Sequence, residues 1–126
     1  MSYNPLGQRC IGYLGSVNMD TTSDQPIPID ASRYIVRRIV VENSSANLTL
    51  AAGGMYTSAS KAGTVVVAAV QLYTALTGST KYLDLTLASA VLSDILTSAT
   101  LYFSLTTAQG SAATARLAIW GDVLTP

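Results

Sequence analysis

Apolar and polar residues alternate in several short stretches of this chain, with turn-forming residues between them and no long helical period. The clearest alternation lies in residues 81–88, 101–106 and 115–120. Each of these predicts a strand with one buried face. A weaker strand is expected over 9–17, where two glycines interrupt the pattern.

The most apolar stretch is 34–42, in which both alternating faces are apolar with an arginine in the middle of each. This pattern predicts a strand that is covered on one side by the core and on the other by a neighbour. Residues 48–50 resume the alternation and are expected to form the partner strand of 34–42. Gly53-Gly54 is expected to break this strand, and residues 55–57 are expected to form a short strand end.

Three further boundaries follow from turn residues and local periodicity. Residues 63–67 predict a strand, and the spacing of apolar residues after it indicates a short helical turn or an irregular segment up to 78. Gly121-Asp122 is expected to end the last strand.

The first thirty residues contain two segments without strand periodicity. Residues 1–8 are polar and predict an extended arm. Residues 18–30 include Pro26 and Pro28, which exclude a helix and cannot donate to a sheet ladder, so an extended loop is expected there. Together these elements predict one all-β domain over 1–126, an antiparallel two-sheet sandwich, jelly-roll-like, with an extended N-terminal arm.

Charge is scarce. Seven basic and seven acidic residues give a net charge of zero, and charged residues make up 11% of a chain that is 49% hydrophobic. A nucleic-acid partner is not expected without a basic patch. No apolar run approaches the length of a membrane span, and the first residues do not resemble a signal peptide. A chain with so few charged residues is expected to bury part of its surface in an assembly. The alternative is a monomer whose polar surface consists of Ser and Thr.

Candidate chemistry is sparse. The chain has no His, so His-dependent catalysis and His metal sites are excluded, and no cofactor is expected. The acids are scattered. The closest pair, Asp20 and Asp24, is interpreted as two loop residues in preference to a catalytic pair. The lone Cys10 is interpreted as a small buried residue. We therefore expect no enzyme.

Arg37 and Arg38 are the only adjacent basic pair. Neighbouring residues of a regular strand point to opposite faces, so these side chains are expected on opposite sides of the sheet. One of them is expected to pair with Glu42 or Asp84, inside the sheet or across a subunit contact; the alternative is a surface arginine on an edge strand. Seven tyrosines and Trp120 suit protein interfaces, because an aromatic ring buries a large area.

Three stretches resemble a known group of proteins: RYIVRRIVVENSSANLTLAAGGMYTSASKAGT, then KYLDLTLA, then ATLYFSLTTAQGSAATARLAIWGD. They are similar to small virion proteins of tailed phages and prophages, in which an Arg/Ile/Val strand leads into a Leu-Thr-x-Ala-Ala-Gly-Gly segment and the last strand ends in Gly-Asp. The resemblance implies a jelly-roll-like protein that decorates or cements an icosahedral capsid, commonly as trimers between major capsid subunits.

The expected function is therefore that of a virion protein, made in the host cytoplasm and bound to the outer capsid surface. Its expected partners are the major capsid protein and itself, as a homotrimer, without nucleic acid or membrane. The strand at 34–42 and the C-terminal strand would build the trimer, and the arm and proline loop would contact the shell. The candidate interface residues are Tyr3, Asn4, Pro5, Leu6, Pro26, Pro28, Arg37, Arg38 and Trp120. The alternative is a receptor- or glycan-binding module of a phage tail or fibre.

Overall fold

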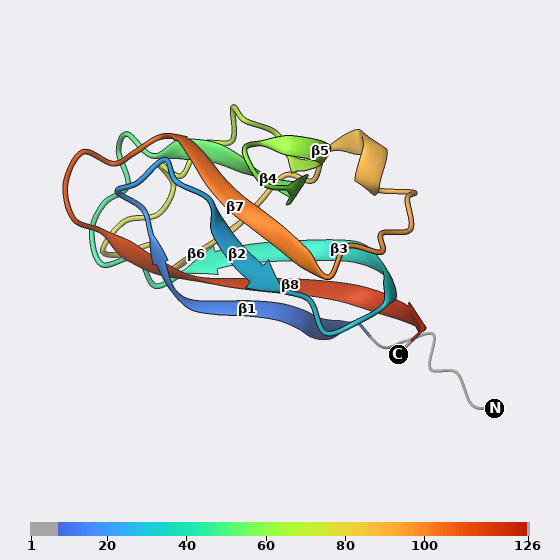
Figure 1. Ribbon diagram of the computed structural model, residues 1–126. Helices are drawn as coiled ribbons and strands as arrows, with labels where there is room; N and C mark the ends of the chain where they lie inside the picture. Colours follow the sequence, from blue (N-terminus) through green and yellow to red (C-terminus); the bar gives the residue numbers. More distant parts are fainter. Residues whose placement is uncertain (1–7, 126) are drawn as a thin grey trace.

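Two antiparallel four-stranded sheets pack face to face in the computed structural model, which describes residues 8–125 (Figure 1). Sheet A has the strand order β1 (Arg9–Asn18), β8 (Thr114–Thr125), β3 (Arg33–Glu42) and β6 (Tyr82–Asp84). Sheet B has the order β2 (Gln25–Pro28), β7 (Thr100–Thr107), β4 (Ala52–Ser58) and β5 (Ala62–Val67). One 3₁₀ turn, η1 (Ser89–Val91), follows β6. The predicted all-β sandwich is confirmed.

The strand pairing follows a simple rule. The first strand pairs with the last, β2 with β7, β3 with β6, and β4 with β5. One long antiparallel ribbon, closed at its tip by the β4–β5 hairpin and rolled over on itself, has this pairing. Further pairs, β3 with β8 and β4 with β7, then join the rolled ribbon into two sheets.

The core lies between the sheets and is built from the alternating inward positions of their strands. The largest buried side chains include Phe103 and Leu105 of β7 and Ile39 of β3. Tyr73, from the segment after β5, meets the Phe103 ring edge-on, with ring centroids 5.9 Å apart at 72°. The predicted burial of the inward faces of 101–106 and 115–120 is confirmed.

The predicted strand at 48–50 is wrong. The backbone N–H groups of Leu50 and Ala51 donate to the side-chain oxygen of Gln109, at 2.9 and 3.1 Å, instead of to a neighbouring strand. The strand begins only at Ala52 and continues through Gly53-Gly54, where the sequence pattern predicts a break. A buried glutamine from a distant loop therefore supplies the hydrogen-bond acceptor that a strand would have supplied.

The loop expected over 18–30 contains a strand. Pro26 and Pro28 belong to β2, which is an edge strand and pairs only with β7. Ile29 donates its N–H to Ala99, and residues two apart present their N–H groups to the same side, so the two proline nitrogens face away from β7. Proline is compatible with an edge strand for this reason.

Two other strand ends differ from the prediction. β6 stops at Asp84, because the chain then leaves sheet A, and Leu87 bridges Val67 of sheet B. The last strand continues past Gly121, where a side chain would clash with the carbonyl oxygen of Ile35, and ends at Thr125. β5 ends at Val67 as predicted, and the residues after it are irregular. The expected arm lies outside the described residues, apart from Gln8.

Gly54→Ala tests the close approach of the end of β5 to β4. A Cβ at position 54 would clash with the carbonyl oxygen of Val67, which is backbone and cannot rotate away. We expect the free energy of unfolding to fall by about 2 kcal/mol or more, as measured by chemical denaturation. Gly78→Ala is the matched control, because nothing lies within 4 Å of that position; equal stability of the two variants would contradict the packing described here.

Stability should fall in alkali because of a buried tyrosine. The Tyr34 hydroxyl donates to Ser98 O at 2.7 Å, and burial raises the pKa of Tyr34 to about 12 from an ordinary 10.0. Burial also raises the pKa of Tyr73. These pKa values are higher in the folded state, so the protonated hydroxyls contribute to the free energy of unfolding. This contribution is complete below pH 10 and is lost as the pH rises toward 12. Denaturation curves across this window should show the loss, with a shallower slope for Tyr34→Phe; a flat profile would contradict it.

Candidate functional site: the outer face of sheet A

Arg37 and Arg38 lie on the same side of sheet A, contrary to the expectation that they point to opposite faces. A β-bulge explains the difference, because Val36 pairs with Gly121 and Arg38 with Trp120, which leaves Arg37 as an extra residue. Burial follows the bulge: the alternation of inward positions shifts by one residue after it, and both arginines are exposed. The bulge thus places two cations on the outer face.

Each of these arginines has an acidic partner on a neighbouring strand. Arg37 Nε donates to Asp122 Oδ2 at 2.7 Å. Arg38 makes two hydrogen bonds to Asp84, one of them from Nη2 to Oδ2 at 3.2 Å, which confirms the expected pairing with Asp84. These bonds, and then the negative charge of Asp84, raise the pKa of the Arg38 guanidinium above its usual value. The outer face therefore presents fixed, charge-balanced pairs.

A shallow hollow of about 330 Å³ lies beside Arg38 on this face. Val40 and Ala118 are paired across β3 and β8 and form part of its lining. Aromatic side chains lie at two corners, Trp120 on β8 and Tyr82 on β6. The remaining lining residues are Arg38, Glu42 and Lys81. The hollow thus combines two aromatic rings with charged groups of both signs.

Two other side chains occupy the same face outside the hollow. Tyr13 pairs with Ala118 across β1 and β8, and its side chain is exposed. Cys10 pairs with Trp120 and is exposed as well, so its interpretation as a buried residue is wrong. Both belong to the outward positions of β1, which is the edge strand of sheet A.

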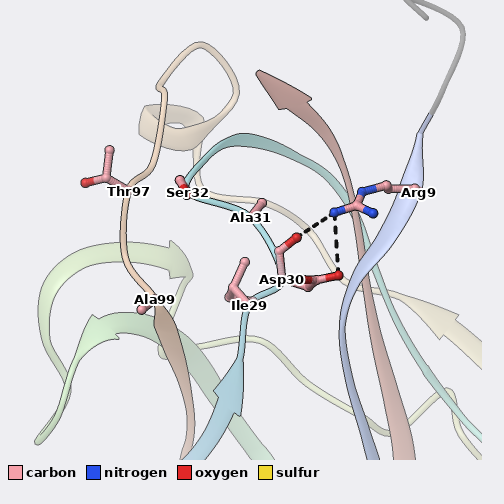
Figure 2. A pocket seen from close by; sticks show the side chains of 7 residues that line it. All are labelled: Arg9, Ile29, Asp30, Ala31, Ser32, Thr97 and Ala99. Carbon is pink, nitrogen blue, oxygen red and sulfur yellow. Dashed lines mark hydrogen bonds and ion pairs between the residues drawn. The ribbon is translucent and has the colours of Figure 1, made fainter. Parts of the chain in front are cut away.

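A second hollow, of about 630 Å³, opens at the end of the sandwich where β1 begins (Figure 2). Figure 2 shows Arg9 directed toward Asp30, whose backbone oxygen accepts a hydrogen bond from Arg9 Nη2 at 2.6 Å. Their side-chain ion pair, at 3.6 Å, is largely open to solvent. Ser32 and Thr97 supply the other polar side chains. The lining holds one ion pair and hydroxyl groups, with no arrangement that indicates a reaction.

The carboxylates of Asp20 and Asp24 hold loops in place. Asp24 accepts a hydrogen bond from the Ser60 N–H at 2.7 Å, and Asp20 accepts one from the Gly110 N–H at 2.8 Å. The bond from Ser60 is the main cause that lowers the pKa of Asp24. Their interpretation as loop residues is confirmed. Across residues 8–125, no group of three or more His, Cys, Asp or Glu side chains could hold a metal ion.

Six large aliphatic side chains outside sheet A are exposed in the part of the chain that the structure describes. They lie on β5 or on the segments before β4, after β5 and after η1. Val70 has the largest exposed fraction, 80%. We call the set the aliphatic surface; it comprises Leu50, Val65, Val70, Leu72, Leu92 and Ile95. Gly54 lies close to the backbone oxygens of Val67 and Ala68, and Leu72 bridges Ala52, so the segment after β5 runs alongside the start of β4.

The structure brings together only some of the predicted interface residues. Arg37, Arg38 and Trp120 share the outer face of sheet A. Pro26 and Pro28 are exposed on the far edge of sheet B. Tyr3, Asn4, Pro5 and Leu6 lie outside the described residues.

Sequence reasoning missed the residues that complete the hollow. Tyr82, Glu42 and Lys81 join Trp120 only through the register of β6 and β8 on β3. The alternation around Tyr82 correctly placed it on an outward face. No local signal in the sequence states which strands are neighbours, so the grouping could not be predicted.

Comparison with known proteins adds no relative. A scan against protein-family models found no match, and searches of curated proteins and of solved structures found none either. Within residues 8–125, no helix is long and apolar enough to cross a membrane.

Proposed function

We propose that this chain is a structural protein of a tailed-phage virion, which decorates and cements the outer surface of an icosahedral capsid by binding across major capsid protein subunits. The three stretches that resemble phage virion proteins support the proposal. We further infer that the sandwich is a jelly roll, because its strands pair as a ribbon rolled on itself would pair them. The arm at 1–8 is proposed to contact the shell.

The aliphatic surface is the observation on which the proposal depends most. Val70, Leu72 and Leu50 each expose more than half of their side chain to water. Single exposed aliphatic residues are common, but six of them on a small domain with zero net charge favour a surface that is covered by a partner. A protein that cements a shell as a homotrimer needs such a surface for the contacts between its own subunits.

We assign the homotrimer contact to the aliphatic surface in place of the face of β3 and β8. Arg37 and Arg38 already have acidic partners within the chain, so another subunit would gain little charge complementarity from them. The aliphatic side chains cannot form such pairs, and their contact with water is unfavourable. Burying them between subunits removes apolar area from solvent, at roughly 25 cal/mol per Å².

No enzymatic activity is proposed. The chain has no His, and the closest pair of acids, Asp20 and Asp24, is engaged with backbone N–H groups. The second candidate function is that of a receptor- or glycan-binding module of a phage tail or fibre. One observation favours it, namely the hollow on sheet A that contains Trp120 and Tyr82.

Quantitative mass spectrometry of virions tests the proposal. Particles released by the strain that encodes this chain would be purified and separated into heads and tails. We expect the chain in the head fraction, in a fixed ratio to the major capsid protein, and depleted from tails. Its presence only in tails would replace the proposal by the tail or fibre module, and its absence from virions would refute both.

A further inference from the structure

We propose that the hollow on the outer face of sheet A is a binding site for uncharged carbohydrate. Its position follows from the register of three strands. Trp120 pairs with Arg38, Ala118 with Val40, and Glu42 with Tyr82, so the lining forms three successive rows across β8, β3 and β6. Trp120 and Tyr82 are therefore two strands apart, about 10 Å across the sheet, and four residues apart along β3, about 13 Å in the strand direction.

The centre and the corners of the hollow differ in size and chemistry. Ala118 and Val40 lie in the middle row together with Asp84, which accepts the hydrogen bonds of Arg38, whereas Trp120 and Tyr82 belong to the outer rows. An aromatic ring presents the negative face of its quadrupole, which attracts the positively polarised C–H face of a sugar ring. The hollow, of about 330 Å³, has room for a short oligosaccharide.

The polar side chains at the hollow can form hydrogen bonds with the hydroxyl groups of a sugar. The Arg38–Asp84 pair is fixed by two hydrogen bonds and offers oriented donors and acceptors, and Glu42 and Lys81 add one acceptor group and one donor group. A sugar hydroxyl both donates and accepts, so it can bond to either kind of group. A few placed polar groups beside apolar walls are the usual composition of a small-molecule site.

Charges of both signs surround the hollow. Arg38 and Lys81 supply two positive charges and Glu42 and Asp84 two negative charges, and the exposed Arg116 lies beside Glu42 across β3 and β8. An acidic polysaccharide would be attracted by the cations and repelled by the carboxylates. An uncharged ligand avoids this conflict. The inference does not depend on capsid cementing; it deepens the second candidate function, which rests on the same hollow.

The single tryptophan of the chain provides the measurement. Trp120 lines the hollow and is the only indole in the sequence, so its fluorescence reports on this site alone. Maltotriose, cellotriose and chitotriose would be titrated separately, which distinguishes α-linked, β-linked and N-acetylated sugars, and an array of neutral and acidic glycans would extend the range. We expect a saturable change in Trp120 emission with at least one neutral oligosaccharide.

Two variants make the test specific to the hollow. Tyr82→Ala removes one aromatic corner and should weaken binding by about tenfold, near the upper limit for a single aromatic contact. Tyr13→Ala is the matched control: it removes an exposed tyrosine from the same sheet face, outside the hollow, and should leave the affinity unchanged. Binding of acidic glycans only, no response to any neutral glycan, or equal loss in both variants would overturn the proposal.

Discussion

The antiparallel pairing of β8 with both β1 and β3 is the interaction on which the rest of the structure depends. This strand lies inside sheet A, and its alternation directs Leu117 and Ile119 into the core while Ala118 and Trp120 face outward. The same ladder therefore fixes the packing between the sheets and the composition of the outer face. It also joins the first strand of the chain to the last. A shift of one residue in its register would exchange the two faces and abolish both the core and the hollow.

The periodicity of the sequence was sufficient for the fold class and for most strand positions, because one buried face imposes a period of two. It failed where long-range contacts replaced a local rule. The glutamine at position 109 satisfies the backbone at 50 and 51, so no strand forms there. An edge position makes β2 compatible with two prolines. The bulge at Arg37 depends on the pairing of β3 with β8, and no local pattern indicates it. The grouping of Trp120 with Tyr82 required the same knowledge of neighbouring strands.

The two groups of exposed side chains are suited to different roles. The aliphatic surface is apolar, so it gains most from being covered. The outer face of sheet A has paired charges, exposed tyrosines and a hollow, and this composition can face water and still recognise a small polar ligand.

The central claim is that the aliphatic surface is buried between copies of the chain, and the native mass of the purified protein tests it most directly. Light scattering at several concentrations should give about three times the chain mass of 13.1 kDa. Replacing Val70 and Leu72 by serine should shift this mass to that of the monomer without loss of fold, because both side chains are exposed within one chain. A monomer of 13.1 kDa at every concentration, for the unmodified protein, would contradict the account.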